Sequence, residues 1–268
     1  MGSGIAQVAA QNGFNVIQFD VNPSMLQKSK AGIESSLQKL TEKQKISSED
    51  KQQILSRINF TSSINECIAD VIIEAIVEDK TIKQKLFDEL FLINDDNTIF
   101  ATNTSSISVT EISAGKNYAS RFAGMHFFNP AQIMKLVEII RSEKTTEDVI
   151  TTLVDLAKQL GKTPVVCNDA PGFIVNRVAR HYYLEAMQLV ENNNEDFKII
   201  DEVMEATGFK MGPFKLMDLI GMDVNYSVSN IVWKALGEPQ RLTPSALQKN
   251  KVDLHELGKK TGKGFYEY

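Results

Sequence analysis

The stretch MGSGIAQVAAQNGFNVIQFD, residues 1–20, decides the fold. Residues 2–13 predict a short helix that begins at a glycine and is closed by one, and residues 15–20 predict a strand that ends in Asp20. A glycine at a helix start, followed about 20 residues later by an acid at a strand end, is typical of a dinucleotide-binding unit. Gly2 and Asp20 are 18 residues apart, so the stretch predicts the second half of such a unit.

Gly2 and Asp20 suit two different parts of a dinucleotide. The N-terminus of a helix presents N–H groups and the positive end of the helix dipole to a pyrophosphate, and a glycine there lets the backbone approach it. A carboxylate at the strand end accepts hydrogen bonds from ribose hydroxyls and repels a 2′-phosphate, so Asp20 favours NAD over NADP. Both features also occur by chance, and alone they are a weak signal.

Helix and strand patterns alternate through the first two thirds of the chain. Short apolar runs predict strands buried in a parallel sheet, and apolar residues at helical spacing predict the helices between them. The alternation predicts an α/β protein with a doubly wound, Rossmann-type sheet. The strand patterns lie at 15–20, 58–63, 69–79, 98–106, 121–130, 135–142 and 163–167, and further helix patterns lie at 22–40, 43–58, 80–93 and 147–160.

The pattern changes after residue 168. PGFIVNRVARHYYLEAMQLVENN predicts one long helix with Pro171 near its start, and the rest of the chain shows helix patterns and an irregular tail, GKKTGKGFYEY. We therefore expect two domains. They are a dinucleotide-binding domain at 1–168, which includes a polar helical hairpin at about 23–57, and a smaller all-α domain at 169–268.

The composition excludes several classes of function. The 43% of hydrophobic and 24% of charged residues indicate a globular protein. The net charge of −5 argues against the basic surface of a nucleic-acid-binding protein. Its apolar runs fall short of the about 20 residues of a membrane span, and we expect no secretory leader. Cys67 and Cys167 show neither disulfide nor metal-ligand spacing, which fits a reducing cytoplasm and no metal site.

His126 has the most suggestive surroundings of the three histidines. It lies in the apolar strand pattern GMHFFNP, where a lone histidine is more often structural. Glu138 changes that balance, because a carboxylate inside the apolar pattern KLVEII is costly unless it is paired. If the two strands are neighbours, His126 and Glu138 can meet, and a histidine held by a carboxylate is a standard general base. His181 and His255 are expected to be structural or solvated.

Polar residues follow the ends of three predicted strands. They are Glu78 and Asp79, residues 103–106, and residues 126–129. Ligands of open α/β sheets bind at the carboxyl ends of strands, so these residues are candidates for a site. Asn176 lies one turn inside the predicted long helix, where a packed or ligand-facing role and a plain solvated side chain both stay open.

Five blocks carry a resemblance to a known family. They are ATNTSSISVTEI, RFAGMHFFNPAQIMKLVEII, DAPGFIVNR, MGPFKLMDLIGMDV and GKKTGKGFYEY, in this order. The chain resembles the L-3-hydroxyacyl-CoA dehydrogenase family over residues 2–268, closely the bacterial 3-hydroxybutyryl-CoA dehydrogenases, and the HFFNP and PGFIVNR blocks are highly specific. The resemblance implies NAD-dependent oxidation of an L-3-hydroxyacyl-CoA to a 3-oxoacyl-CoA, and the reverse.

The resemblance also implies the roles of individual residues. On the catalytic side it makes His126 the general base, pairs Glu138 with it, and lets Ser105 and Asn176 hold the substrate oxygen. A lysine can meet the phosphates of CoA, although a solvated charge is the plain alternative for Lys43. The implied NAD contacts are Gly2, Asp20, Glu78, Lys83, Asn103, Asn129 and Lys260, and the implied CoA contacts are Ser36 and Lys43.

The beginning of the chain departs from the family pattern. The family has a strand followed by GxGxxG, and only the third glycine, Gly2, is present here. The absent strand is the central one, so its neighbours would be left unpaired at a cost comparable to a domain's stability of about 5–15 kcal/mol. We expect about a dozen further residues before Met1 in the natural protein. The alternative is a short chain that folds poorly or binds NAD weakly.

Three functions remain open at this point. The first is the NAD-dependent dehydrogenase, acting in fatty acid or butanoate metabolism. The second is a non-catalytic acyl-CoA-binding relative, and the third is a dehydrogenase of free hydroxy acids, against which Ser36 and Lys43 argue mildly. The resemblance further implies a homodimer through the C-terminal domain, whose helices should carry apolar surface beyond the needs of its own core. Acyl chain length and the direction used in the cell are not fixed by the sequence.

Overall fold

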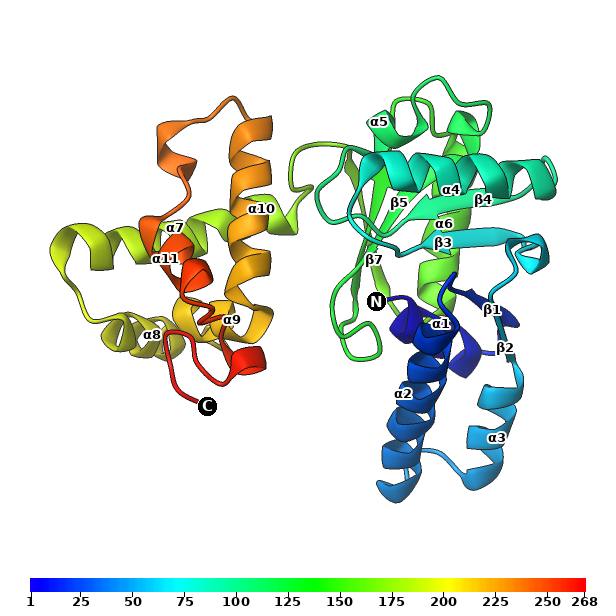
Figure 1. Cartoon of the computed structure of the whole chain (residues 1–268), viewed down its shortest axis with the longest axis horizontal. Helices are drawn as coiled ribbons and strands as arrows, with labels where there is room; N and C mark the ends of the chain where they lie inside the picture. Colours follow the sequence, from blue (N-terminus) through cyan, green and yellow to red (C-terminus); the bar gives the residue numbers. More distant parts are fainter. The chain divides into compact units, whose positions relative to one another are not determined.

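The alternating patterns fold into an α/β unit, Met1–Asp169, and the helical patterns into an all-α unit, Ala170–Tyr268 (Figure 1). This computed structural model describes residues 1–268. The predicted Rossmann-type α/β domain followed by a helical domain is confirmed. None of the helices has the length and apolar content needed to cross a bilayer.

The strands of the α/β unit form two sheets. The smaller sheet pairs β1 (Val16–Phe19) in parallel with β2 (Ile58–Thr61). The larger has the order β3-β4-β5-β6-β7, in which β5 and β6 are antiparallel and the other pairs are parallel. Its strands are β3 (Val71–Glu74), β4 (Ile99–Thr102), β5 (Phe122–Phe127), β6 (Leu136–Arg141) and β7 (Thr163–Asn168).

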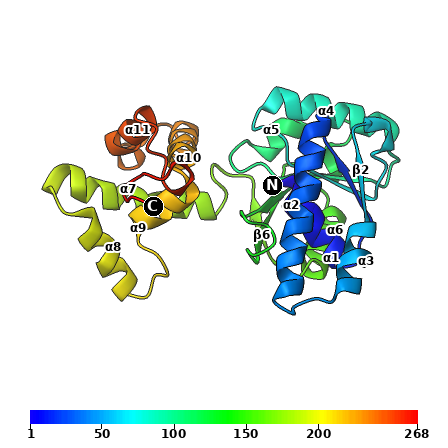
Figure 2. The same ribbon diagram turned by 60° about the horizontal axis from the view of Figure 1, so that its bottom comes forward.

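Helices cover both faces of the larger sheet. On one face lie α4 (Lys80–Ile93) and α5 (Val109–Ser113), and on the other lies α6 (Glu147–Gln159) (Figure 1). The helices α1 (Gly2–Gln11), α2 (Pro23–Glu42) and α3 (Ser48–Ser56) surround the β1–β2 pair, and α1 and α2 lie side by side (Figure 2). Short 3-10 turns are Ile64–Glu66 and Ala119–Arg121.

The run at 69–79 was expected to be a buried central strand, and this is wrong in two respects. The strand β3 stops at Glu74, and its first three residues are only half-buried, because β3 is the edge strand of its sheet. The chain leaves the strand because the Glu74 carboxylate accepts the backbone N–H of Ile76 at 2.6 Å, which turns the backbone immediately after β3. β1 and β3 are not hydrogen-bonded to each other, which agrees with the expectation that the strands at 15–20 and 69–79 are left unpaired on these sides.

The predicted start of the long helix is also corrected. The long helix α7 (Val175–Asn193) begins at Val175 and not at Pro171, because Gly172 and Phe173 have φ of +73° and +48° and so cannot continue a right-handed helix. Asn176 is therefore in the first turn of the helix.

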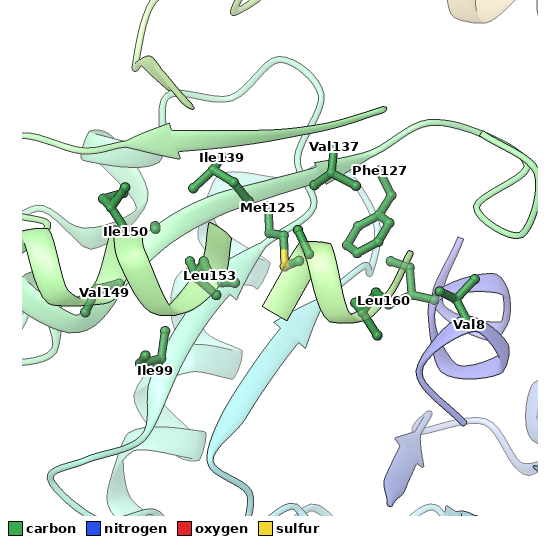
Figure 3. Packing of buried hydrophobic residues seen from close by; sticks show 14 of the residues in the cluster. Val8, Ile99, Met125, Phe127, Val137, Ile139, Val149, Ile150, Leu153 and Leu160 are labelled. Carbon is green, nitrogen blue, oxygen red and sulfur yellow. The ribbon is translucent and has the colours of Figure 1, made fainter. Parts of the chain in front are cut away.

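The main core lies between the sheet and α6 (Figure 3). Met125 and Phe127 of β5 and Val137 and Ile139 of β6 point toward α6, which contributes Leu153 among others. Because side chains alternate along a strand, the residues between these positions face the opposite side of the sheet. Two of them are His126 and Glu138, so apolar packing on one face fixes where the polar pair points.

Two buried carboxylates hold the all-α unit together. Asp218, 1% exposed, accepts the backbone N–H groups of Phe265 and Tyr266 and the hydroxyl of Tyr268. Asp201 accepts the N–H groups at the start of α9 and the hydroxyl of Tyr266 at 2.8 Å. The remaining helices are α8 (Phe197–Ala206), α9 (Pro213–Ile220), α10 (Met222–Ala235) and α11 (Ala246–Asp253), with 3-10 turns at Gln240–Leu242 and Lys259–Thr261.

We predict that Asp218→Ala lowers the free energy of unfolding of the all-α unit by about 2–4 kcal/mol, because three donors in and beside the C-terminal tail lose a charged acceptor. Urea denaturation followed by tryptophan fluorescence measures the change, since Trp233, the only tryptophan, packs in this unit's core. Asp253→Ala is the matched control: it breaks an exposed pair with Lys249 and should cost less than about 0.5 kcal/mol. Equal costs for both variants would contradict the prediction.

Candidate active site

The register of β5 and β6 places His126 directly opposite Glu138. The distance from His126 Nδ1 to Glu138 Oε2 is 2.8 Å, and the residues are 6% and 1% exposed. A carboxylate accepts hydrogen bonds, so Nδ1 carries the proton and the basic lone pair is on Nε2. The predicted pair therefore forms, and the carboxylate can stabilise the imidazolium that results from proton uptake.

The ends of β3, β4 and β5 lie at one edge of the larger sheet, because these strands are parallel. Asn103 follows β4, and its side-chain carbonyl accepts the backbone N–H of Phe127, the last residue of β5, at 2.8 Å. The turn that begins at Asn103 is thereby fastened beside His126. Asn129, two residues beyond β5, is exposed at the same edge.

Glu78 accepts hydrogen bonds from the turn that contains Ser105. Its Oε1 accepts the hydroxyl of Thr104 at 2.6 Å, the backbone N–H of Ser105 at 3.0 Å and the hydroxyl of Ser106 at 3.1 Å. Desolvation raises the pKa of Glu78, but the hydrogen bonds from this turn and the nearby charge of Lys83 outweigh it, so the pKa is lowered. Glu78 is thus an anion with 35% of its side chain exposed, which leaves it accessible to a ligand.

Lys83 is too deeply buried to be a simple ligand contact. Its side chain is 1% exposed, and its Nζ lies 2.6 Å from Glu74 Oε1 and 3.3 Å from Glu78 Oε2. Glu74 is also buried and accepts the hydroxyl of Thr102 at 2.7 Å. The structure therefore brings Glu78, Lys83 and Ser105 together, as the sequence indicated, but sets Lys83 behind Glu78.

The N-terminus of α1 lies at the same edge. A Cβ at Gly2 would lie 4.0 Å from that of Ala75, so α1 begins beside the end of β3. The first hydrogen bond at this helix end runs from the Gly4 N–H to the Met1 carbonyl, so the amides of Gly2 and Ser3 point out of the helix. Asp20 follows the end of β1, half-buried. These residues fit NAD, with the helix end for its pyrophosphate and the carboxylate for a ribose.

The helical hairpin is connected to this edge through Gln7. This buried side chain of α1 donates to the Ser36 hydroxyl at 3.0 Å, and its oxygen accepts Gln132 Nε2, from the loop after β5, at 3.2 Å. Lys43 is the C-cap residue of α2 and is exposed. Gln7 thus connects Ser36 to the loop after β5, whereas Lys43 lies at the C-terminal end of α2.

Two predicted site residues lie in the all-α unit. The main-chain carbonyl of Asn176 accepts Arg180 Nε at 3.0 Å. Lys260, in the tail, forms an ion pair with Asp223, the second residue of α10. The roles of both residues toward substrate and cofactor stay predictions.

Several polar residues of this edge were not predicted from the sequence. Glu74 carried a usable signal, since it is a carboxylate in the apolar run VIIEAIV, the same pattern that pointed to Glu138. Thr102, Thr104 and Gln7 carried none, because threonine in a strand and glutamine in a helix are ordinary surface residues until packing buries them.

A paired histidine beside a strand-end anion cluster and a helix N-terminus defines an NAD-type α/β dehydrogenase. Residues 1–170 match the family "3-hydroxyacyl-CoA dehydrogenase, NAD binding domain", and residues 172–268 match "3-hydroxyacyl-CoA dehydrogenase, C-terminal domain". The chain therefore belongs to the 3-hydroxyacyl-CoA dehydrogenase family. It is an oxidoreductase, and its cofactor is NAD.

Relatives and solved structures agree with this family. The rat "Hydroxyacyl-coenzyme A dehydrogenase, mitochondrial" is 41% identical over 276 residues, covering 100% of this chain and 88% of the relative. The "Probable 3-hydroxybutyryl-CoA dehydrogenase" of Deinococcus radiodurans is 40% identical over 270 residues, covering 100% and 96%.

Two solved structures are 3-hydroxybutyryl-CoA dehydrogenases. That from Ralstonia eutropha has a TM-score of 0.95 at 37% identity and covers 100% of this chain and 95% of that one. That from Escherichia coli has a TM-score of 0.96 at 40% identity, and this chain spans 57% of its length.

We predict that Cys167 reports the charge of Glu138. Burial first, and then the negative charges of Glu138 and Asp169, raise the pKa of the Cys167 thiol to about 12. Glu138→Gln should lower this pKa and speed alkylation of Cys167 at pH 9 by about threefold or more, because one unit of pKa is a tenfold change in thiolate. The measurement uses iodoacetamide on a Cys67→Ser background.

The control for this measurement is Asp155→Asn, an exposed residue of α6 paired only with Lys158. It should leave the Cys167 rate unchanged. An unchanged rate in Glu138→Gln as well would contradict the prediction.

Proposed function

We propose that this chain interconverts short-chain L-3-hydroxyacyl-CoA and 3-oxoacyl-CoA, with 3-hydroxybutyryl-CoA and acetoacetyl-CoA as its pair of substrates. The observation that carries the proposal is the buried His126–Glu138 pair, 2.8 Å apart. The printed names of the Deinococcus and Ralstonia relatives support the short chain. A non-catalytic acyl-CoA-binding protein would have no use for a histidine held by a buried carboxylate.

His126 handles the proton of the reaction. In the oxidation direction Nε2 removes the proton of the 3-hydroxyl group, while NAD, when bound, accepts the hydride from the same carbon. Glu138 keeps the imidazole in the tautomer that can accept this proton and then stabilises its positive charge. In the reverse direction the protonated His126 donates to the ketone oxygen. The burial of the pair excludes water from this transfer.

The other sequence-predicted residues, except the buried Lys83, keep the roles that the family resemblance gave them, as proposals. Ser105 and Asn176 hold the substrate oxygen, and Ser36 and Lys43 bind CoA. The fastening of Ser105 beside the end of β5, through Glu78 and Asn103, supports its role. Asp20, Asn129 and Lys260 are the remaining cofactor contacts, with the α1 N-terminus at Gly2.

We predict that the protein oxidises NADH with acetoacetyl-CoA and that His126→Ala lowers kcat by about 10²–10⁴-fold, the usual loss of a general base. Absorbance at the NADH band follows the reaction. His255→Ala, in the C-terminal region, is the matched control and should keep full activity. No turnover by the wild-type protein, or equal turnover by His126→Ala, would contradict the proposed function. Faster turnover of free acetoacetate than of its thioester would favour a free-acid dehydrogenase.

We also propose a homodimer formed through the all-α unit. This unit leaves many large apolar side chains exposed, more than a unit of its size needs to leave outside its core. They include Ile174, Val178, Ile199, Val203, Phe209, Leu219, Val224 and Leu254. Ile199 and Val203 lie one turn apart on α8 and are both 54% exposed, so they form one stripe.

We predict a dimer at micromolar concentration by light scattering, and a shift toward monomer in the double variant Ile199→Glu/Val203→Glu. Two carboxylates in a buried apolar interface would be unpaired and costly. Glu202→Gln on the same helix should leave the dimer intact, since Glu202 is already polar and exposed. A monomeric wild-type protein would overturn the proposal, and a dimeric double variant would move the interface off α8.

The compartment is proposed from the two thiols. Cys67 and Cys167 are both free, and both have raised pKa values, chiefly because they are buried. Unpaired, unreactive thiols fit a reducing compartment such as the bacterial cytoplasm.

A further inference from the structure

Glu74 is the most deeply buried carboxylate of the α/β unit that the reaction scheme does not use. Its side chain has no exposed surface, and both of its oxygens have partners. Oε1 lies 2.6 Å from Lys83 Nζ and accepts the N–H of Ile76, and Oε2 accepts the hydroxyl of Thr102. A buried charge with this many partners is held in one position.

Lys83 can affect the site only through its contact with Glu78. Its ammonium group is surrounded by Glu74 and Glu78, and at 1% exposure its side chain offers almost no surface to a ligand. The three charges sum to −1, and the excess negative charge belongs to Glu78, the member that is partly exposed. Lys83 therefore sets the position and the charge of Glu78.

Glu78 in turn sets the position of Ser105. Four groups of the turn after β4 donate to a single oxygen of Glu78, the one that does not face Lys83, and the Ser105 hydroxyl is one of them, at 3.5 Å. If Glu78 moved toward Lys83, these four hydrogen bonds would lengthen together. The turn would then lose its hydrogen bonds to Glu78 and keep the hydrogen bond between Asn103 and the backbone of β5.

We propose that Glu74 is a positioning residue for the dehydrogenase reaction. It holds Lys83, Lys83 holds Glu78, and Glu78 places the Ser105 turn while presenting an anion on the cofactor side. Lys83 thus acts on the cofactor through Glu78 and not by direct contact. This inference rests on the proposed function for the role of Ser105, whereas the chain of contacts stands on the geometry alone.

Glu74→Gln tests the inference. The amide oxygen can still accept from Ile76 or Thr102, but the charge is lost, and the buried Lys83 is left with Glu78 as its only anion. Glu78 should then shift toward Lys83 and release the turn. We expect kcat with acetoacetyl-CoA to fall about tenfold, because small displacements of positioned groups are costly, with KM for acetoacetyl-CoA changed less than threefold. NADH binding, measured by fluorescence titration, should weaken about fivefold.

The matched control is Glu111→Gln. Glu111 also pairs with a lysine of α4, Lys80, at 2.9 Å, but both side chains are exposed. Its loss should leave kcat and NADH binding within twofold of wild type. In a double-mutant cycle, Glu74→Gln/Lys83→Met should lose no more activity than the worse single variant, because both changes break the same connection.

The outcomes separate the possible failures. If Glu74→Gln keeps wild-type kcat and NADH affinity and only lowers the melting temperature, the residue is merely structural and the inference is wrong. If the wild-type protein shows no turnover, the proposed function fails, and NADH titration of wild type and Glu74→Gln still decides whether Glu74 acts through Glu78. If Glu74→Gln does not fold, Glu74→Asp, which keeps the charge but draws it back from Lys83, should show the same losses at smaller size.

Discussion

The antiparallel pairing of β5 with β6 is the constraint on which the site depends. Met125, Phe127, Val137 and Ile139 are buried against α6, and the two-residue repeat of a strand then forces the residues between them to the other face. A shift of one residue in register would expose the apolar side chains and separate His126 from Glu138. The packing of the apolar core therefore also fixes the position of His126 relative to Glu138.

A second constraint is the cost of burying charge. Glu74, Lys83 and Glu138 each lie in an environment where an unpaired ion would be strongly destabilising, and each has an ionisable partner. Glu74 also accepts hydrogen bonds from the Ile76 N–H and the Thr102 hydroxyl. The same requirement organises the all-α unit, where Asp201 and Asp218 bind backbone N–H groups of α9 and of the tail. In both units buried carboxylates connect segments that are distant in the sequence.

The sequence predicted most elements and the essential pair, and its errors have physical causes. Periodicity located α4 at its observed bounds and most strands to within a few residues. It failed at 69–79 because apolar composition continues past the point where Glu74 turns the backbone. It failed at the start of α7 because a positive φ at Phe173 is a property of the folded turn and has no signature in the residue type.

By itself, the sequence determined the α/β alternation, the family motifs and the need of Glu138 for a partner, because periodicity and the cost of a carboxylate in an apolar strand are local properties. Only the tertiary structure decided that Lys83 lies behind Glu78, that Glu74 fixes it, and that Gln7 joins the hairpin to the loop after β5. The reason is that these contacts join side chains from separate elements, and burial arises only when the elements pack.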